Sequence, residues 1–284
     1  MFHEVVRAGS VRAASDLLGV SASSITRQIQ QLEHQIGATL LDRSSTGVAP
    51  THAGKLVAQF AQSVVLEYDT LRADVNERRG LKGHIRVAAV ESTMGKVIDA
   101  IAALREKFFD VTFSLSMLPA GRVFEAVKTS EVDVGVTFCA APDPDLTVLA
   151  RYVEPVVLAV SPNHDWAFKE SVALHELSRV ALGIPETTFG VRSILDEEAR
   201  KCGLKLMPSL VTNSFDALRA FARSGAVSVL PRMSFDSERR ANILKTVVID
   251  STALNETTAD VITLRERRPS RLLKLFYSEL ERMF

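Results

Sequence analysis

The sequence predicts a protein of the α/β class, with a helical N-terminal part, one long helix, and a larger part in which strands and helices alternate. Two short helical patterns separated by a glycine turn lie within residues 9–51. A narrow apolar stripe then runs through residues 52–78, and from residue 84 onward β-rich runs alternate with helical patterns. These three observations indicate two or more domains connected by a helix.

The N-terminal part has the pattern of a helix-turn-helix unit. Ser10 is a candidate N-cap for a first amphipathic helix, which Gly19 ends, and Ser21 is a candidate N-cap for a second. The residues expected to face inward recur at helical spacing; they are Val11, Ala14, Leu17 and Leu18 in the first helix and Ile25, Ile29, Leu32 and Ile36 in the second.

The outer face of the second helix carries the groups that suit DNA recognition. It presents hydroxyls, an amide and a guanidinium near its N-terminus, through Ala22, Ser23, Thr26, Arg27 and Gln30. Arg27 is the best candidate for base readout, because its guanidinium can bond guanine through two hydrogen bonds. The alternative, an ordinary solvated face, is preferred for Gln30 alone but not for the whole group.

The spacing becomes specific when it is read over some fifty residues. It contains F-x-x-V-x-x-x-G-S, R-A-A-x-x-L, V-S-x-S-S-I-T-R-Q-I-x-x-L-E, G-x-x-L-L-D-R and P-T-x-A-G. This ordered set resembles the DNA-binding domain of LysR-type transcriptional regulators. The residues that carry it are Phe2, Val5, Gly9, Ser10, Arg12, Ala13, Ala14, Leu17, Val20, Ser21, Ile25, Thr26, Arg27, Gln28, Ile29, Leu32, Glu33, Gly37, Leu40, Leu41, Asp42, Arg43, Pro50, Thr51, Ala53 and Gly54.

The resemblance implies a winged helix-turn-helix over residues 1–51, with residues 42–49 as the wing and its Arg43, Ser44 and Ser45 near phosphate. Family members often have Gln where this chain has Ala22, so one amide contact to adenine is missing. Phe2 corresponds to the middle of the family's first helix, so either the gene begins upstream or this helix is shortened. The candidate DNA-binding residues are Ser10, Arg12, Ser21, Ala22, Ser23, Thr26, Arg27, Gln30, Arg43, Ser44 and Thr51.

Composition agrees with a globular protein but does not by itself point to DNA. The 284 residues are 46% hydrophobic and 24% charged, with a net charge of zero. No apolar run approaches the roughly 20 residues that span a bilayer, and no signal sequence opens the chain, so we expect a cytoplasmic protein with no membrane partner. Cys139 and Cys202 lack metal or redox spacing, so we expect buried small residues rather than a regulatory disulfide.

The apolar stripe predicts a linker helix over residues 52–79, followed by a hinge at residues 80–83. The helix could pack on its own domain, but its length exceeds what the small N-terminal domain can cover. A two-chain coiled coil fits better, and the resemblance implies that this helix forms the dimer.

Strand and helix patterns alternate twice after the hinge, which predicts a mainly parallel sheet covered by helices. The resemblance implies a two-lobed, Rossmann-like effector domain over residues 84–284, similar to type 2 periplasmic binding proteins. Lobe I would comprise residues 84–160 and 266–284, and lobe II residues 161–265.

Two strand-to-helix junctions, Ser92-Thr93 and Thr187-Thr188-Phe189, are candidate anion sites at helix N-termini. Each hydroxyl alone is better explained as a cap, but two facing junctions would suit a small carboxylate. Arg122 is equally consistent with a contact to such a carboxylate and with a solvated position. With the positions implied by the resemblance, the candidate effector-binding residues are Ser92, Thr93, Ala120, Gly121, Thr137, Phe138, Thr187, Thr188, Phe189, Asn213 and Phe215.

We therefore expect a sequence-specific transcriptional regulator whose activity is modulated by a small anionic effector bound between two lobes. The alternative is a small-molecule binding protein whose N-terminal helices serve only assembly. An enzyme is not favoured, because the chain lacks G-x-S-x-G, a phosphate loop and H-E-x-x-H, and nothing indicates a metal or cofactor. Expected partners are double-stranded DNA, the effector and further copies of the chain in a dimer or tetramer. RNA polymerase is a further candidate partner.

Overall fold

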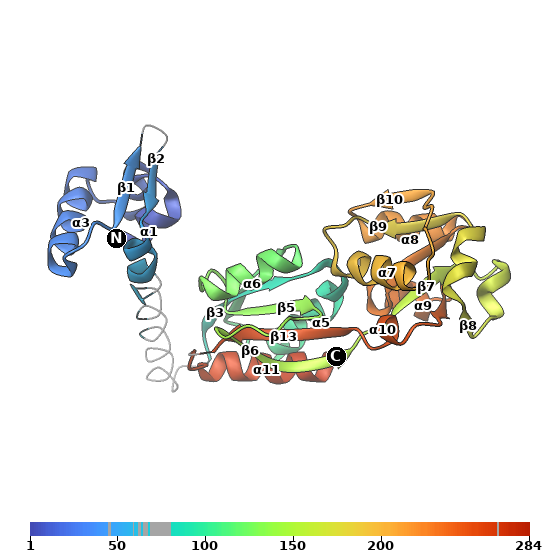
Figure 1. Cartoon of the computed structure of the whole chain (residues 1–284). Coiled ribbons are helices and arrows are strands. Elements are labelled where there is room, and N and C mark those ends of the chain that lie inside the picture. The colour runs from blue at the N-terminus through green and yellow to red at the C-terminus, as the bar shows by residue number, and fades with distance from the viewer. Residues whose placement is uncertain (45–46, 59, 62–63, 65–67, 69–80, 266) are drawn as a thin grey trace. The chain divides into compact units, whose positions relative to one another are not determined.

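The computed structural model describes residues 1–44, 47–58, 60–61, 64, 68, 81–265 and 267–284. The chain divides into two compact units, Met1–Asn76 and Glu77–Phe284 (Figure 1). Most of the expected linker helix, and residue 80 of the expected hinge, lie outside the described residues. Gly83, the last residue of that hinge, is the first residue of a strand, where it pairs with Val111.

The N-terminal unit begins with three helices, α1 (Phe2–Ala8), α2 (Val11–Leu18) and α3 (Ala22–Ile36). A hairpin of β1 (Leu41–Ser44) and β2 (Gly47–Pro50) follows and forms the expected wing. Both expected N-caps are present, because Ser10 Oγ accepts the Ala13 N–H and Ser21 Oγ accepts the Ser24 N–H. Gly9, Gly19 and Gly37 end the three helices with positive φ, which glycine adopts without strain.

The core of this unit is smaller than the helical pattern predicts. It contains Val5, Ala14, Ile25, Ile29 and Leu40. Leu17 is 64% exposed, and Leu18 and Ile36 are exposed too, so their expected inward placement is wrong. In α2 the fully buried side chain is Ala14, and Val11 packs partly buried against the same core, while the larger leucines lie outside it.

Lobe I of the second unit is a five-stranded sheet in the order β4-β3-β5-β13-β6. Its strands are β3 (Gly83–Ala89), β4 (Val111–Met117), β5 (Val134–Phe138), β6 (Leu146–Val153) and β13 (Thr258–Leu264). Helices α5 (Met94–Lys107) and α11 (Arg271–Met283) share one hydrophobic cluster with the sheet. Helix α6 (Ala120–Lys128) packs in a separate cluster, so the sheet is covered on both sides.

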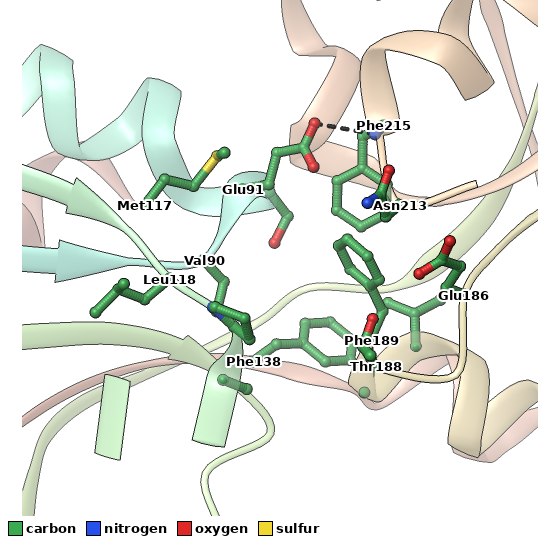
Figure 2. Close-up of a pocket in the computed structure, with 15 residues that line it drawn as sticks. Val90, Glu91, Met117, Leu118, Phe138, Glu186, Thr188, Phe189, Asn213 and Phe215 are labelled. Carbon is green, nitrogen blue, oxygen red and sulfur yellow. Dashed lines mark hydrogen bonds between the residues drawn. The ribbon is translucent and has the colours of Figure 1, made fainter. Parts of the chain in front are cut away.

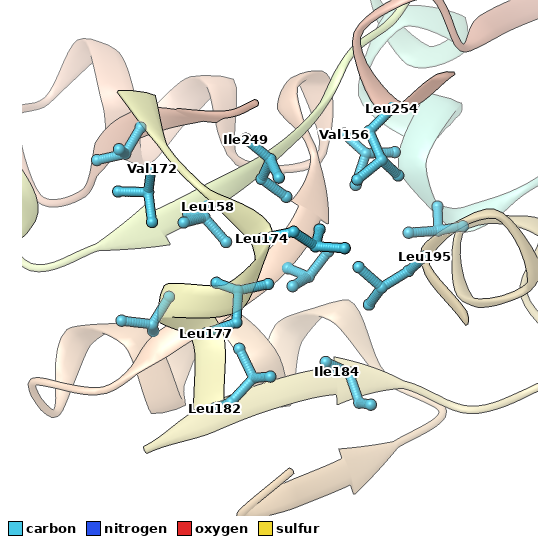
Figure 3. Close-up of a cluster of buried hydrophobic side chains, with 14 of the residues drawn as sticks. Val156, Leu158, Val172, Leu174, Leu177, Leu182, Ile184, Leu195, Ile249 and Leu254 are labelled. Atoms are coloured by element: carbon cyan, nitrogen blue, oxygen red, sulfur yellow. The ribbon is translucent and has the colours of Figure 1, made fainter. Parts of the chain in front are cut away.

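Lobe II is a six-stranded sheet in the order β10-β9-β11-β7-β12-β8. Its strands are β7 (Val156–Val160), β8 (Ser171–Val172), β9 (Leu182–Pro185), β10 (Leu210–Thr212), β11 (Val227–Pro231) and β12 (Lys245–Ile249). Helix α7 (Gly190–Lys201) packs into the larger cluster, which includes Leu158, Leu182, Leu195 and Ile249 (Figure 3). Helix α8 (Phe215–Arg223) packs into a second one with Leu230 and Phe235.

The expected borders between the lobes are wrong at both crossings. Strand β7 pairs with β11 and β12 and so belongs to lobe II, while β13 pairs with β5 and β6 and so belongs to lobe I. The chain crosses at Glu154-Pro155, between β6 and β7, and returns between Ile249 and Thr258. Edge strand β6 alternates in burial and gives a weak strand pattern, so the sequence predicts the fully buried run of β7 as the last strand of lobe I.

Each sheet is also mixed rather than mainly parallel, because the crossing strands β7 and β13 run antiparallel to their neighbours. Both cysteines are exposed, which contradicts the expectation of buried small residues, and neither forms a disulfide.

Candidate functional site

The face of α3 opposite its buried isoleucines is the candidate DNA-reading surface. Ile25 and Ile29 face the core, while Ser23, Arg27 and Gln30 are exposed and Thr26 is half-buried. Residues three and four apart share one face of a helix, so these four side chains form one polar surface near the N-terminal half of α3. Ala22 is exposed beside them and contributes only a methyl group.

Two arginines of this unit have no intramolecular role among the described residues. The exposed guanidiniums of Arg12, on α2, and Arg27, on α3, form no hydrogen bond or ion pair within the described part of the chain. An exposed arginine in a folded domain often pairs with a neighbouring acid, and these two pair with none of the acids that the structure describes. Their donors are therefore available to phosphate oxygens or base edges.

Three of the candidate DNA-binding residues cap helices, and this structural role explains their residue types without any contact to DNA. Ser10 and Ser21 cap α2 and α3. Thr51 accepts the Gly54 N–H at 3.0 Å and donates to the Thr39 carbonyl at 2.7 Å, so it caps the helix that begins at residue 52. Arg43 and Ser44 lie on β1 of the wing, and their side chains are outside what the structure describes.

Glu33 has a role that the sequence did not suggest. Its Oε1 accepts the backbone N–H of Leu40 at 2.8 Å and of Leu41 at 3.3 Å. These bonds connect the last turns of α3 to the start of the wing. Glu33 therefore fixes the position of the first wing strand, β1, relative to α3. The signal available in the sequence was only an acid placed on the inner side of an otherwise polar helix.

The second candidate site is a cavity of about 350 Å³ between the two lobes. It lies where β3 and β5 end in lobe I, and where the segments before α7 and α8 begin in lobe II (Figure 2). This size is in the range of small-molecule sites. Its lining is Val90, Glu91, Ser92, Met117, Leu118, Pro119, Ala120, Phe138, Glu186, Thr188, Phe189, Gly190, Val191, Asn213 and Phe215.

Most of the wall is apolar and much of it is aromatic. Figure 2 shows the rings of Phe138, Phe189 and Phe215 following one another along the cavity. The Phe189 and Phe215 rings lie 4.9 Å apart between centroids, and their planes are tilted by 51°. Met117 and Leu118 add aliphatic surface from lobe I. Such a wall favours a ligand with a flat apolar ring.

Glu91 spans the two lobes. Its Oε1 accepts the backbone N–H of Phe215 at 2.9 Å, at the N-terminus of α8 (Figure 2). Burial raises the pKa of Glu91 above its ordinary value, while the Phe215 N–H and nearby Arg219 act in the opposite direction. One helix N-terminus at the cleft is therefore already occupied by a carboxylate of the protein itself.

The remaining polar groups of the wall are mostly acceptors. The side chains of Glu186 and Asn213 form no hydrogen bond or ion pair with other described residues. Donors come from the first turns of α6 and α7, which have no side-chain cap. No lysine, arginine or histidine is among the described residues that line the cavity. Arg122 is exposed and lies 3.5 Å from Glu131 instead.

The structure brings only part of the expected effector site together. Ser92, Ala120, Phe138, Thr188, Phe189, Asn213 and Phe215 line the cavity. Thr93, Gly121, Thr137 and Thr187 do not line it.

Physical reasons are visible for two of these exclusions. Thr93 is buried and its hydroxyl donates to the Val90 carbonyl at 3.0 Å. Thr137 is buried next to Phe138 on β5, and neighbouring strand residues face opposite sides of a sheet.

The two carboxylates of the cavity were missed. Glu91 directly precedes Ser92, and Glu186 directly precedes Thr187, so each lies beside a residue that was singled out. An anionic ligand calls for hydroxyls and N–H groups at helix N-termini, and that requirement does not single out neighbouring acids. The feature that could have found them is the occurrence of an acid at the end of a buried strand in both halves of the domain.

Comparison with known families decides the classification. Residues 78–284 match the family described as "LysR substrate binding domain", and residues 1–55 match "Bacterial regulatory helix-turn-helix protein, lysR family". This chain belongs to the LysR family. It is thus a LysR-type DNA-binding transcriptional regulator with an effector-binding domain, as the resemblance implied.

Individual relatives agree. The chain is 27% identical over 207 residues to the uncharacterized HTH-type transcriptional regulator YfeR of Shigella flexneri, covering 72% of this chain and 67% of that one. A full-length OxyR variant from Pseudomonas aeruginosa has the same fold, with a TM-score of 0.77, 18% identity, and coverage of 99% and 93%. The effector-binding domain of QuiR in complex with shikimate matches at a TM-score of 0.58 and 16% identity, covering 71% and 96%.

These relatives are regulators of transcription by name or family, which agrees with the absence of familiar catalytic motifs in the sequence. Within the described residues, no helix is both long and apolar enough to cross a membrane. Groups of three or more histidines, cysteines or acids able to hold a metal ion are also absent from that part of the chain.

Proposed function

We propose that this regulator binds double-stranded DNA with the outer face of α3, and that a small molecule in the cavity between lobes I and II changes that binding. The observation that carries the first part is the exposed guanidinium of Arg27 on the polar face of α3, which has no partner among the residues that the structure describes. Ser23, Thr26 and Gln30 share this face, and Arg12 adds a cation from α2. Arg43 and Ser44 of the wing complete the proposed contacts on the strength of the family resemblance.

The second part rests on the form and lining of the cavity. Residues of both lobes line it, so a molecule bound there contacts both and favours one arrangement of them over others. QuiR, which has the same fold in this region, holds shikimate in its effector-binding domain. A ligand can alter DNA binding only through different affinities for two arrangements of the protein.

We propose that the chain acts as a dimer or tetramer and does so in the cytoplasm, where chromosomal DNA lies. The zero net charge supports the first point, because a second copy doubles the cations that one chain can bring to DNA. RNA polymerase is a further partner that such a regulator would contact. We assign no catalytic role to the chain.

The direct test is to select genomic DNA fragments with the purified full-length protein, footprint a bound site, and compare Arg27→Ala with the wild type. Loss of a bidentate arginine–guanine contact costs roughly 1–3 kcal/mol, so specific affinity should fall about five- to 150-fold. The matched control is Arg105→Ala, which removes an exposed arginine from α5 of the other unit and should leave affinity unchanged.

Salt separates this function from simple small-molecule binding. Affinity for the footprinted site should fall steeply as salt rises, because bound phosphates release counterions. A protein whose N-terminal helices served only assembly would show no such DNA affinity at any salt concentration. Equal affinity of Arg27→Ala and the wild type would refute the assignment of α3.

A further inference from the structure

The charges that line the cavity do not suit a simple anion. A bound carboxylate would need compensation by a cation or by several N–H donors once water is excluded. The described lining residues include no lysine, arginine or histidine, but do include Glu91 and Glu186. The N-terminus of α8 could have served an anion, but it already receives the carboxylate of Glu91.

Among the described residues, Glu186 is a carboxylate of the lining that has no side-chain partner. It lies immediately after β9, is partly buried, and forms no hydrogen bond or ion pair with another described side chain. A half-buried carboxylate without a partner is costly, and a bound cation would remove that cost. The carboxamide of Asn213, equally without a partner in the described residues, offers an acceptor from the same lobe.

The aromatic wall strengthens this preference. In the view of Figure 2, Phe189 and Phe215 are drawn between Glu91 and Glu186. The Phe215 N–H donates to Glu91, and the Phe189 N–H donates to the Glu186 carbonyl, so each acid lies next to one of these two residues. Ring faces attract cations, most strongly where water is excluded, and they also stack against a flat apolar ring. The open N–H groups of α6 and α7 carry only partial positive charge, which two full negative charges outweigh.

We infer that the effector is an aromatic amine, with its ring among Phe138, Phe189 and Phe215 and its ammonium group on the carboxylate of Glu186. Glu91 adds negative potential from lobe I while keeping its bond to Phe215. The open N–H groups of α6 and α7 donate to a neutral oxygen of the ligand where it has one. This inference rests on the proposed function, since it names the chemistry of the same cavity.

The test uses three probes of similar size that differ in charge: 2-phenylethylamine, 2-phenylethanol and 3-phenylpropionate. Their binding to the purified full-length protein is measured by calorimetry. The amine should bind roughly tenfold or more tightly than either other probe, the factor expected for a charge-assisted hydrogen bond. Glu186→Gln keeps the shape of the side chain and should bring the amine to the level of the alcohol.

Glu170→Gln is the matched control, because it removes the same charge from an exposed position of lobe II outside the lining and should keep the full preference for the amine. Glu91→Gln retains an oxygen for the Phe215 N–H and should lower amine affinity without abolishing it. All variants should bind the footprinted DNA as the wild type does, and an unchanged melting temperature of the second unit shows that the substituted unit folds.

Three outcomes would overturn the inference: tighter or equal binding of 3-phenylpropionate, a preference for the amine that survives in Glu186→Gln, or no binding of any probe by the wild type. Each would leave the regulator assignment standing as long as the wild type binds its DNA site and Arg27→Ala binds that site more weakly. Failure of the wild type to bind any DNA fragment would instead overturn the proposed function.

Discussion

The two candidate sites of this chain are built in opposite ways. The DNA-reading face comes from one helix, and its polar residues and buried isoleucines alternate within a short stretch of sequence. The cavity takes its wall from segments between Val90 and Phe215 that meet only when both lobes have folded. A site encoded locally can be recognised from spacing, whereas the charge of a site assembled from distant segments depends on the fold.

A substitution at Gly54 should damage the N-terminal unit alone. A Cβ on Gly54 would lie 1.9 Å from the Leu40 carbonyl oxygen. This oxygen belongs to the backbone, so it can move away only if the chain around Leu40 shifts. We expect Gly54→Ala to cost roughly 3 kcal/mol or more and to abolish DNA binding. Probe binding in the cavity should persist, as measured by calorimetry.

The matched substitution in the other unit is Gly95→Ala on α5, where an added Cβ meets nothing within 4 Å. We expect it to stabilise the second unit by about 0.5–1 kcal/mol, because alanine loses less backbone freedom than glycine in a helix. If Gly54→Ala kept full DNA affinity, the close packing of this helix on Leu40 would not be required for the reading surface.

The local part of the fold was the predictable part. The spacing of Ile25 and Ile29, the caps Ser10 and Ser21, and the wing that follows were all anticipated, because each depends on neighbours a few residues away. Leu17 was expected to be buried and is exposed, since a helical period shows which residues share a face but not how much of that face another element covers.

The lobe borders could not be read from the sequence. The buried run of β7 follows β6 after two residues, and nothing in its composition tells which of two sheets it joins. The sequence predicts the cavity residues near helix N-termini but not Glu91 and Glu186 beside them. These two acids belong to different lobes, and they line one cavity only because the chain crosses twice between the lobes.

The crossing itself offers the second prediction. Glu154 is 2% exposed, its Oε1 accepts the Met233 N–H at 2.5 Å, and its backbone N–H donates to the Thr257 carbonyl at 2.7 Å. Burial raises the pKa of Glu154 from 4.5 to about 7, with Arg232 and Lys96 opposing the rise and Asp236 adding to it. The carboxyl between the lobes therefore holds its proton more tightly in the folded protein than in the unfolded chain.

Stability from this group is complete below pH 4.5, decreases as pH rises towards about 7, and changes little above that. The loss is on the order of 3 kcal/mol. We expect the melting temperature of the second unit, relative to Glu154→Gln, to fall across this range, because glutamine does not titrate. A constant difference between the two proteins would contradict the location of this carboxyl in the folded state.

The smallest predicted effect separates capping from DNA contact at Ser21. Replacing a serine N-cap by alanine costs about 1 kcal/mol, whereas aspartate keeps the cap. Ser21→Asp should therefore melt as the wild type does. If Ser21 also lies against phosphate, Ser21→Asp should bind DNA more weakly than Ser21→Ala, in a salt-dependent manner. Equal affinities of these two variants would leave Ser21 with its capping role alone.

Ligand binding in the cavity and DNA binding by α3 should each change the affinity of the other. Affinity for the footprinted DNA site should be measured for the wild type and Glu186→Gln while 2-phenylethylamine is raised to saturation. The account predicts a change in DNA affinity in the wild type that is lost or strongly reduced in Glu186→Gln, and by reciprocity an equal effect of DNA on amine binding. An unchanged DNA affinity in a wild type that calorimetry shows to be saturated with the amine would contradict it.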